Sequence, residues 1–162
     1  MRELDGTRRR AWLEVDLDAL ERNYRRLASP PGTSGEGGPA LLPMLKADGY
    51  GLGAVRVMKA LRHRAPWAFG VATTEEGRQL REAGFEGRIV VFSACPPCDG
   101  DALRRHRLEP AVSSCDGLEV YAERGTGARP VTVHLELDTG MGRLGLVATE
   151  RETWIERVRE AL

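Results

Sequence analysis

Residues 41–53 read Leu-Leu-Pro-Met-Leu-Lys-Ala-Asp-Gly-Tyr-Gly-Leu-Gly, which is a short apolar run followed by a lysine and a glycine-rich stretch. A short apolar run bounded by turn residues is typical of a buried strand. An apolar pattern of helical period follows over residues 54–64. The segment therefore predicts a strand, a turn and a helix, which together form the basic unit of an α/β fold.

The same unit repeats along the chain at intervals of about 20–26 residues. Further strands are expected at 67–71, 88–92, 109–112 and 131–137, and further helices at 74–83, 98–106, 115–123 and from 149 to the end. Thr74 and Asp116 are expected to cap helices at their N-termini, and Gly84 to end one. Strands that alternate with helices predict a parallel sheet with right-handed crossovers. About five such units are too few to close an eight-stranded barrel, so the pattern fits either an open sheet or part of a larger barrel.

The first forty residues carry less pattern. Residues 1–10 hold four arginines without apolar periodicity, which indicates a frayed basic arm, and the folded domain is expected to span 11–162. A short strand is predicted at 11–15, and a helix capped by Asp16 or Asp18 is predicted to continue to Leu27. Residues 29–39 are rich in glycine, proline and serine, which is typical of a surface loop.

Composition excludes several classes of function. The chain has 24 basic and 24 acidic side chains, so no net charge attracts nucleic acid or an anionic membrane. Its apolar runs are far shorter than the ~20 residues that span a bilayer, so we expect a cytoplasmic protein without a nucleic-acid or membrane partner. Three cysteines do not suggest a disulfide framework. Cys95 and Cys98 have the spacing of a redox or zinc pair but no second pair, so we interpret them as free thiols and predict no metal site.

Lys46 occupies the position where parallel α/β folds keep their functional groups, at the carboxyl end of a strand. Desolvation by apolar neighbours can lower the pKa of such an amine, as Schiff-base chemistry requires. The turn that follows can offer backbone N–H groups to an anion such as a phosphate. The alternative is a solvated lysine beside glycines that only shape the turn.

A second polar segment, residues 131–145, reads Val-Thr-Val-His-Leu-Glu-Leu-Asp-Thr-Gly-Met-Gly-Arg-Leu-Gly. An apolar and polar strand leads into a glycine-containing loop with Asp138 and Arg143. The planar guanidinium of Arg143 is suited to bind a carboxylate or a ring hydroxyl. The alternative is a structural pair between Asp138 and Arg143.

Taken together, the two segments resemble the cofactor-lysine region and the arginine loop of the alanine racemase family, and residues 11–20 are similar to the start of that family. The resemblance covers about residues 11–150, which match the first half of the family's length. It implies an eight-stranded α/β barrel followed by a β-rich C-terminal domain, in a homodimer. The fold class expected here is therefore α/β of the parallel TIM-barrel type, incomplete, with about five of eight βα units and without the C-terminal β domain.

The resemblance also implies a chemistry: the cofactor is pyridoxal 5'-phosphate, and the reaction interconverts L-alanine and D-alanine, a peptidoglycan precursor. By the same resemblance Lys46 is the Schiff-base lysine and the base on one face of the substrate. Tyr50 matches a tyrosine that contacts the cofactor phosphate. Arg143 matches the arginine that binds the cofactor ring hydroxyl and the substrate carboxylate.

Two positions depart from the family pattern. Leu52 replaces a histidine in the glycine-rich turn. Glu136 stands where many members carry a carbamylated lysine, and its carboxylate is expected to hold Arg143 directly.

The family's opposite-face base, a tyrosine of the partner subunit, has no match in these residues, so the isolated chain is expected to be inactive as a racemase, although one base can still exchange an α-proton. Two alternatives remain: a stand-alone cofactor carrier or related decarboxylase, and a non-catalytic remnant or interaction module.

Overall fold

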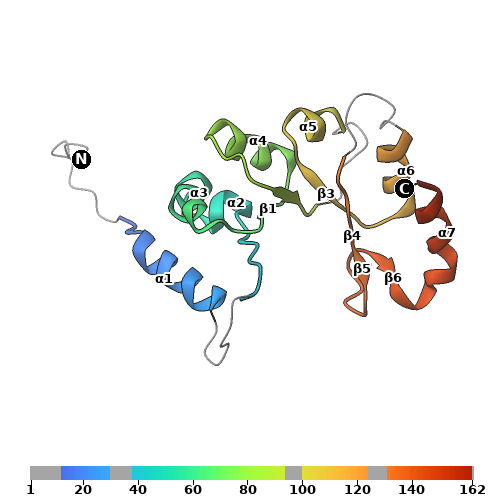
Figure 1. Ribbon diagram of the computed structural model, residues 1–162, viewed down its shortest axis with the longest axis horizontal. Helices are drawn as coiled ribbons and strands as arrows, with labels where there is room; N and C mark the ends of the chain where they lie inside the picture. The colour runs from blue at the N-terminus through green and yellow to red at the C-terminus, as the bar shows by residue number, and fades with distance from the viewer. Residues whose placement is uncertain (1–11, 30–37, 94–99, 124–130, 162) are drawn as a thin grey trace.

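The computed structural model describes residues 12–29, 38–93, 100–123 and 131–161, and in these segments strands alternate with helices (Figure 1). The helices are α1 (Leu17–Ala28), α2 (Lys46–Tyr50), α3 (Ala54–Leu61), α4 (Thr74–Glu82), α5 (Gly100–Arg105), α6 (Cys115–Glu123) and α7 (Arg151–Ala161), with 3-10 turns η1 (Arg62–Arg64) and η4 (Ala148–Glu150). The strands are β1 (Phe69–Val71), β2 (Ile89–Val91), β3 (Glu109–Val112), β4 (His134–Leu135), β5 (Leu137–Asp138) and β6 (Leu146–Val147).

The main sheet is parallel and follows the chain, in the order β1-β2-β3-β4. Residues 41–45 lie on the other side of β1, where Met44 forms a parallel bridge with Gly70 and the Leu45 N–H donates to the Gly70 carbonyl at 2.6 Å. A separate parallel pair joins β5 to β6. The α/β class and the incomplete parallel barrel are therefore confirmed.

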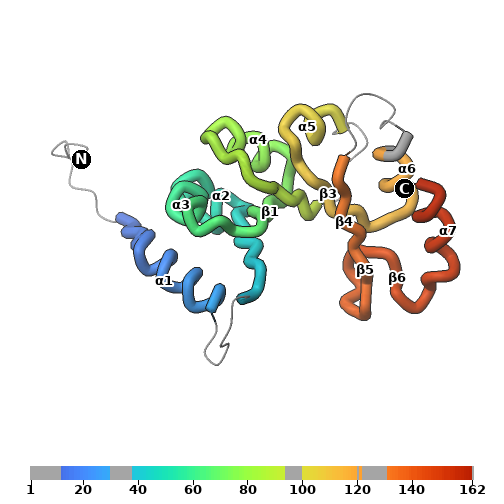
Figure 2. Tube along the Cα trace, in the orientation of Figure 1, coloured from blue at the N-terminus to red at the C-terminus, as the bar shows by residue number. Residues whose placement is uncertain are grey.

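The sheet is curved. A flat parallel sheet would separate β1 from β4 by about 14 Å, because neighbouring strands lie about 4.8 Å apart. The rings of Trp67, just before β1, and His134, at the start of β4, nevertheless meet edge to face with centroids 5.8 Å apart. Figure 1 shows α3, α4 and α5 along one side of the resulting arc, and Figure 2 shows the chain following it from α1 to α7.

A polar cluster lies at the amino ends of the same strands. Arg88 donates from Nε and Nη2 to the Glu109 carboxylate at 3.0 and 2.8 Å, and its guanidinium lies 4.0 Å from the Trp67 ring centroid. His134 Nε2 lies 2.8 Å from the Glu109 Oε2 atom. Burial alone would raise the pKa of Glu109, but the hydrogen bonds from Arg88 and His134 outweigh it and lower that pKa. These contacts connect four consecutive strands.

The hydrophobic core lies between the strands and the helices. Its buried members include Phe69 and Val71 of β1, Ile89 and Val91 of β2, and the helical residues Val57, Met58, Leu61 and Leu80. Gly70 points the other way: a Cβ there would come within 2.3 Å of Met44 Sδ and 2.6 Å of Leu42 Cδ2. The side chains of Met44 and Leu42 thus occupy the space that a side chain at position 70 would take.

Helix ends agree with the predictions in part. Asp16 caps α1 by accepting from the Ala19 N–H at 2.8 Å. Gly84 has φ +87° and lies one residue beyond Ala83, the C-cap of α4, and the Phe85 N–H donates to the Leu80 carbonyl at 3.1 Å. Both features match helix-capping geometry, so these two predictions are confirmed.

The other two capping predictions are wrong. The N-cap of α4 is Thr73 rather than Thr74, and the side chain that caps α6 is Ser114, whose Oγ accepts from the Gly117 N–H at 3.1 Å. Thr74 and Asp116 lie within the first turn instead. An N-cap residue must precede the helical backbone, so residues inside that turn cannot serve.

Strand predictions also need correction. Residues 12–15 form no strand, and the strand expected at 131–137 is two short strands that flank Glu136. Residues 41–45 form only one isolated bridge, since Pro43 has no N–H to donate.

Residues 1–10, Ala11, Cys95 and Cys98 lie outside the described residues. No helix in the described ranges is long and apolar enough to cross a membrane.

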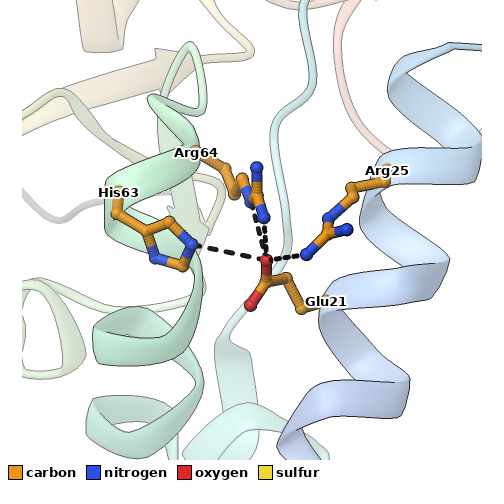
Figure 3. A network of polar contacts seen from close by, with 4 residues as sticks. All are labelled: Glu21, Arg25, His63 and Arg64. Atoms are coloured by element: carbon orange, nitrogen blue, oxygen red, sulfur yellow. Dashed lines mark hydrogen bonds and ion pairs between the residues drawn. The ribbon is translucent and has the colours of Figure 1, made fainter.

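An acidic side chain joins α1 to η1, the turn that follows α3 (Figure 3). Glu21 Oε1 accepts from Arg25 Nη2 at 2.7 Å and from Arg64 Nε at 2.7 Å, and His63 Nε2 lies 3.4 Å away. The hydrogen bonds from Arg25 and Arg64 lower the pKa of Glu21 from 4.5 to about 2. Glu21 therefore stabilises the docking of α1 only while it is ionised.

The lowered pKa makes stability depend on pH in the acid range. The contribution of Glu21 is complete above pH 4.5 and is lost as the pH falls towards about 2. We expect Glu21→Gln to reduce the free energy of unfolding near neutral pH and to make its decline below pH 4.5 shallower. Urea unfolding at a series of pH values measures this, with the exposed Glu160→Gln as control. If the free energy of unfolding falls equally steeply below pH 4.5 in the Glu21→Gln and unmutated proteins, the prediction is wrong.

Candidate functional site

Lys46 directly follows the strand-like segment 41–45, at the carboxyl end of the parallel sheet. The residue after β1 at the same edge is Ala72, and the segment after β4 at that edge carries Glu136. Active sites of (β/α) barrels lie at this end. The predicted position of Lys46 is therefore confirmed.

The turn after Lys46 is left-handed. Ala47, Asp48, Gly49, Tyr50 and Gly51 have φ angles of 53°, 52°, 64°, 56° and 82°. For the three non-glycine residues this conformation costs about 1–2 kcal/mol each. Strained backbone of this kind persists only where the surroundings determine it, and it is common at functional sites.

Hydrogen bonds hold the turn. The Gly49 N–H donates to the Leu45 carbonyl at 2.8 Å, and the Gly53 N–H donates to the Asp48 carbonyl at 2.8 Å. Asp48 Oδ1 also accepts from the Ala54 N–H, the first of α3, at 2.7 Å. Asp48 thus connects the turn to α3, a role that its sequence position did not indicate.

Lys46 and Tyr50 lie together on this turn. Lys46 Nζ is 5.9 Å from the centroid of the Tyr50 ring, within reach of a cation–π contact. Tyr50 is 62% exposed, and Lys46 is exposed as well. The described residues do not provide the apolar surroundings that the sequence led us to expect around the lysine amine, and no ion pair in them involves Lys46.

Asp138 organises the second polar segment. Its carboxylate accepts from the Gly140 N–H at 2.9 Å and from the Gly142 N–H at 3.0 Å. These backbone hydrogen bonds lower the pKa of Asp138. The alternative of a structural Asp138–Arg143 pair is not what the structure shows, because the Asp138 oxygens bind backbone N–H groups instead.

Arg143 and Glu136 come from adjacent parts of this segment. Arg143 is exposed and Glu136 is half-buried, and the Glu136 backbone pairs with the Val112 carbonyl at 2.9 Å and the Leu146 N–H at 2.8 Å. No ion pair within the described ranges joins the two side chains, so direct support of Arg143 by Glu136 stays a prediction. The structure brings Lys46 and Tyr50 together. Arg143 and Glu136 lie further along the sheet, because β1, β2 and β3 separate the segment before Lys46 from β4, the strand that precedes Glu136.

An apolar cleft of about 340 Å³ lies beside the lysine turn, between α1 and residues 41–45. Tyr50 and Leu52 contribute to its wall, and Leu52 is half-buried there. The lining contains no cationic side chain. The cleft lining therefore offers no positive charge to a phosphate.

Comparison with known proteins decides the family. The model of the alanine racemase N-terminal domain matches residues 15–161. The chain belongs to this family. The alanine racemase of a Nostoc species is 37% identical over 142 residues, which are 84% of this chain and 35% of that protein. The alanine racemase of Geobacillus stearothermophilus is 37% identical over 148 residues, which are 90% of this chain and 36% of that protein.

Solved structures agree with the family assignment. An alanine racemase from Clostridium difficile has a TM-score of 0.78 at 26% identity, covering 90% of this chain and 37% of that one. The enzyme from Corynebacterium glutamicum has a TM-score of 0.77 at 28% identity, covering 91% and 41%. The chain thus spans little more than a third of the alanine racemases that it matches.

Proposed function

We propose that these residues form the cofactor-lysine part of a pyridoxal 5'-phosphate-dependent alanine racemase that interconverts L-alanine and D-alanine and acts as a homodimer in the cytoplasm. The observation that carries the proposal is Lys46 at the carboxyl end of the strand-like segment 41–45, beside the parallel sheet and directly before a strained left-handed turn. The family assignment supports it, because relatives that match over most of this chain are named alanine racemases.

The residues present fit the cofactor. Lys46 supplies a primary amine without an ion-pair partner in the described part of the chain, and Tyr50 supplies an exposed hydroxyl on the same turn. Arg143 adds an exposed guanidinium. When bound, pyridoxal phosphate supplies a conjugated ring that takes up the electrons released as the Cα–H bond breaks.

Each residue then has a defined role. Lys46 would hold the cofactor through its amine and would move the proton at Cα on one face of the substrate. The Tyr50 hydroxyl would hold the cofactor phosphate. Arg143 would bind the substrate carboxylate and the cofactor ring hydroxyl.

The reaction is tested by Cα–H exchange. Incubation of the chain with pyridoxal phosphate and L-alanine in D₂O is expected to replace the Cα hydrogen by deuterium, which proton NMR follows directly. Release of carbon dioxide would favour a decarboxylase instead. Cofactor uptake without exchange would favour a carrier, and the absence of both would favour an interaction module. The comparisons lend no support to these alternatives.

Glu136 offers a test of how Arg143 is held. If the Glu136 carboxylate orients Arg143 in the bound state, Glu136→Gln should raise the KM for L-alanine in the exchange reaction by about tenfold or more, the effect of losing one charge-assisted hydrogen bond. The exposed Glu152→Gln on α7 serves as control. Added bicarbonate should change nothing, because no carbamate is needed. Activation of the unmutated chain by bicarbonate would contradict this role.

A further inference from the structure

The carboxylate of Glu76 joins two loops that follow neighbouring strands. Glu76 is the third residue of α4. Its Oε1 accepts from the Ala47 N–H at 2.8 Å, and its Oε2 accepts from the Ala72 N–H at 2.7 Å and from the Thr73 N–H at 3.3 Å. One side chain therefore binds three backbone donors at the carboxyl edge of the sheet.

This exceeds what a helix cap requires. In a capping box the glutamate reaches back to the N-cap N–H, which here belongs to Thr73, while the Thr73 hydroxyl accepts from the Glu76 N–H at 3.2 Å. The Ala72 and Ala47 bonds are additional. Ala47 is 29 residues away in the sequence, so its bond to Glu76 is a tertiary contact between α4 and the left-handed turn.

The Ala47 N–H lies in the peptide group that follows Lys46. In the peptide group before the Lys46 Cα, the Leu45 carbonyl accepts from the Gly49 N–H of the same turn at 2.8 Å, and one peptide earlier the Leu45 N–H donates to the Gly70 carbonyl at 2.6 Å. Of the two peptide groups that flank the Lys46 Cα, the one after it is therefore held by a distant segment, through the bond from the Ala47 N–H to Glu76. Ala47 also has φ +53°, and an alanine needs such an external contact to stay there.

We propose that Glu76 is a positioning residue for Lys46: its carboxylate holds the Lys46–Ala47 peptide group and the left-handed turn, and so fixes the direction in which the lysine side chain leaves the backbone. This inference rests on the proposed function, because the direction of the Lys46 amine matters only if that amine binds the cofactor. Glu76 itself touches no reacting atom.

An ionised carboxylate is needed for this arrangement. Both of its oxygens accept hydrogen bonds, whereas glutamine has one acceptor oxygen and an NH₂ group that would face an N–H donor. Glu76→Gln therefore keeps the size of the side chain and removes one side of the link. Glu75→Gln is the matched control, since Glu75 lies in the same helical turn but pairs with Arg78 and Gln79 at the surface.

The first readout needs no cofactor. Amide hydrogen exchange of the chain, followed by NMR, should show the Ala47 amide exchanging about tenfold faster in Glu76→Gln, the change that corresponds to one charge-assisted hydrogen bond. Glu75→Gln should leave it unchanged. Thr73→Ala, which removes the hydroxyl of the cap and keeps the Glu76 carboxylate, should also leave it unchanged. Equal exchange in Glu76→Gln and the unmutated chain, or equal acceleration by Thr73→Ala, would overturn the proposal.

The second readout is the rate at which pyridoxal phosphate and borohydride label Lys46. We expect Glu76→Gln to slow this labelling and Glu76→Gln/Ala47→Gly to recover part of the loss, because glycine adopts a positive φ without help. If Glu76 served only as a helix cap, Ala47→Gly would recover nothing. A double variant that labels no faster than Glu76→Gln would therefore contradict the proposal. If Lys46 is unlabelled in every chain while the Ala47 result stands, the proposed function fails and the structural role of Glu76 does not.

Discussion

A Lys46→Ala variant is expected to lose the visible absorbance band that pyridoxal phosphate develops with the unmutated chain. The band requires a covalent link between the cofactor aldehyde and an amine, and Lys46 supplies that amine at the carboxyl edge of the sheet. The chain contains only two lysines, Lys46 and Lys59. Lys59 is exposed on α3, so Lys59→Ala is the matched control and should keep the band.

The titration is carried out on all three proteins at the same cofactor concentrations, with circular dichroism to confirm that each is folded. The loss in Lys46→Ala should be essentially complete. A band that survives in Lys46→Ala and disappears in Lys59→Ala would contradict the assignment of the cofactor lysine.

With L-alanine in D₂O, the chain is expected to exchange the Cα hydrogen and to form almost no D-alanine. Lys46 provides a base on one face of the substrate, and inversion needs a proton donor on the other. The resemblance to the family places that donor, a tyrosine, in a C-terminal domain of the partner subunit, and these 162 residues have no match for it. Exchange with retention should therefore exceed inversion by orders of magnitude.

Chiral chromatography of the recovered alanine measures inversion, and proton NMR of the same sample measures exchange. Lys46→Ala is the control for both and should show neither. Turnover to D-alanine near the ~10 s⁻¹ that is typical of enzymes would show that the second base lies within this chain.

Sequence patterns predicted the elements that local interactions decide. The bounds of β3 and α6 match the expected ranges 109–112 and 115–123, because short apolar runs and helical periodicity are local signals. The predicted strand at 131–137 is interrupted at Glu136, since β4 pairs with β3 whereas β5 pairs with β6. Which strand a segment pairs with depends on the whole fold and not on its own residues.

The site residues were likewise only partly predictable from the sequence. The resemblance of two sequence motifs identified Lys46 and Tyr50 as one cluster, and their spacing of four residues places both on a single turn. The left-handed backbone at Ala47 could not be predicted, because alanine disfavours positive φ and its anchor, Glu76, lies 29 residues further on. The Thr-x-x-Glu pattern of residues 73–76 indicates a capping box, but nothing in it indicates the bond to Ala47.

The most direct test of the assigned site is a peptide map of the unmutated chain after incubation with pyridoxal phosphate and reduction with borohydride. Mass spectrometry counts the phosphopyridoxyl groups on the peptides that carry Lys46, Lys59 and the N-terminal amine. The proposed role of Lys46 predicts that the label is concentrated on Lys46 at low cofactor concentration and that Lys59 remains largely unmodified. Equal labelling of the two lysines, or preferential labelling of Lys59, would contradict it.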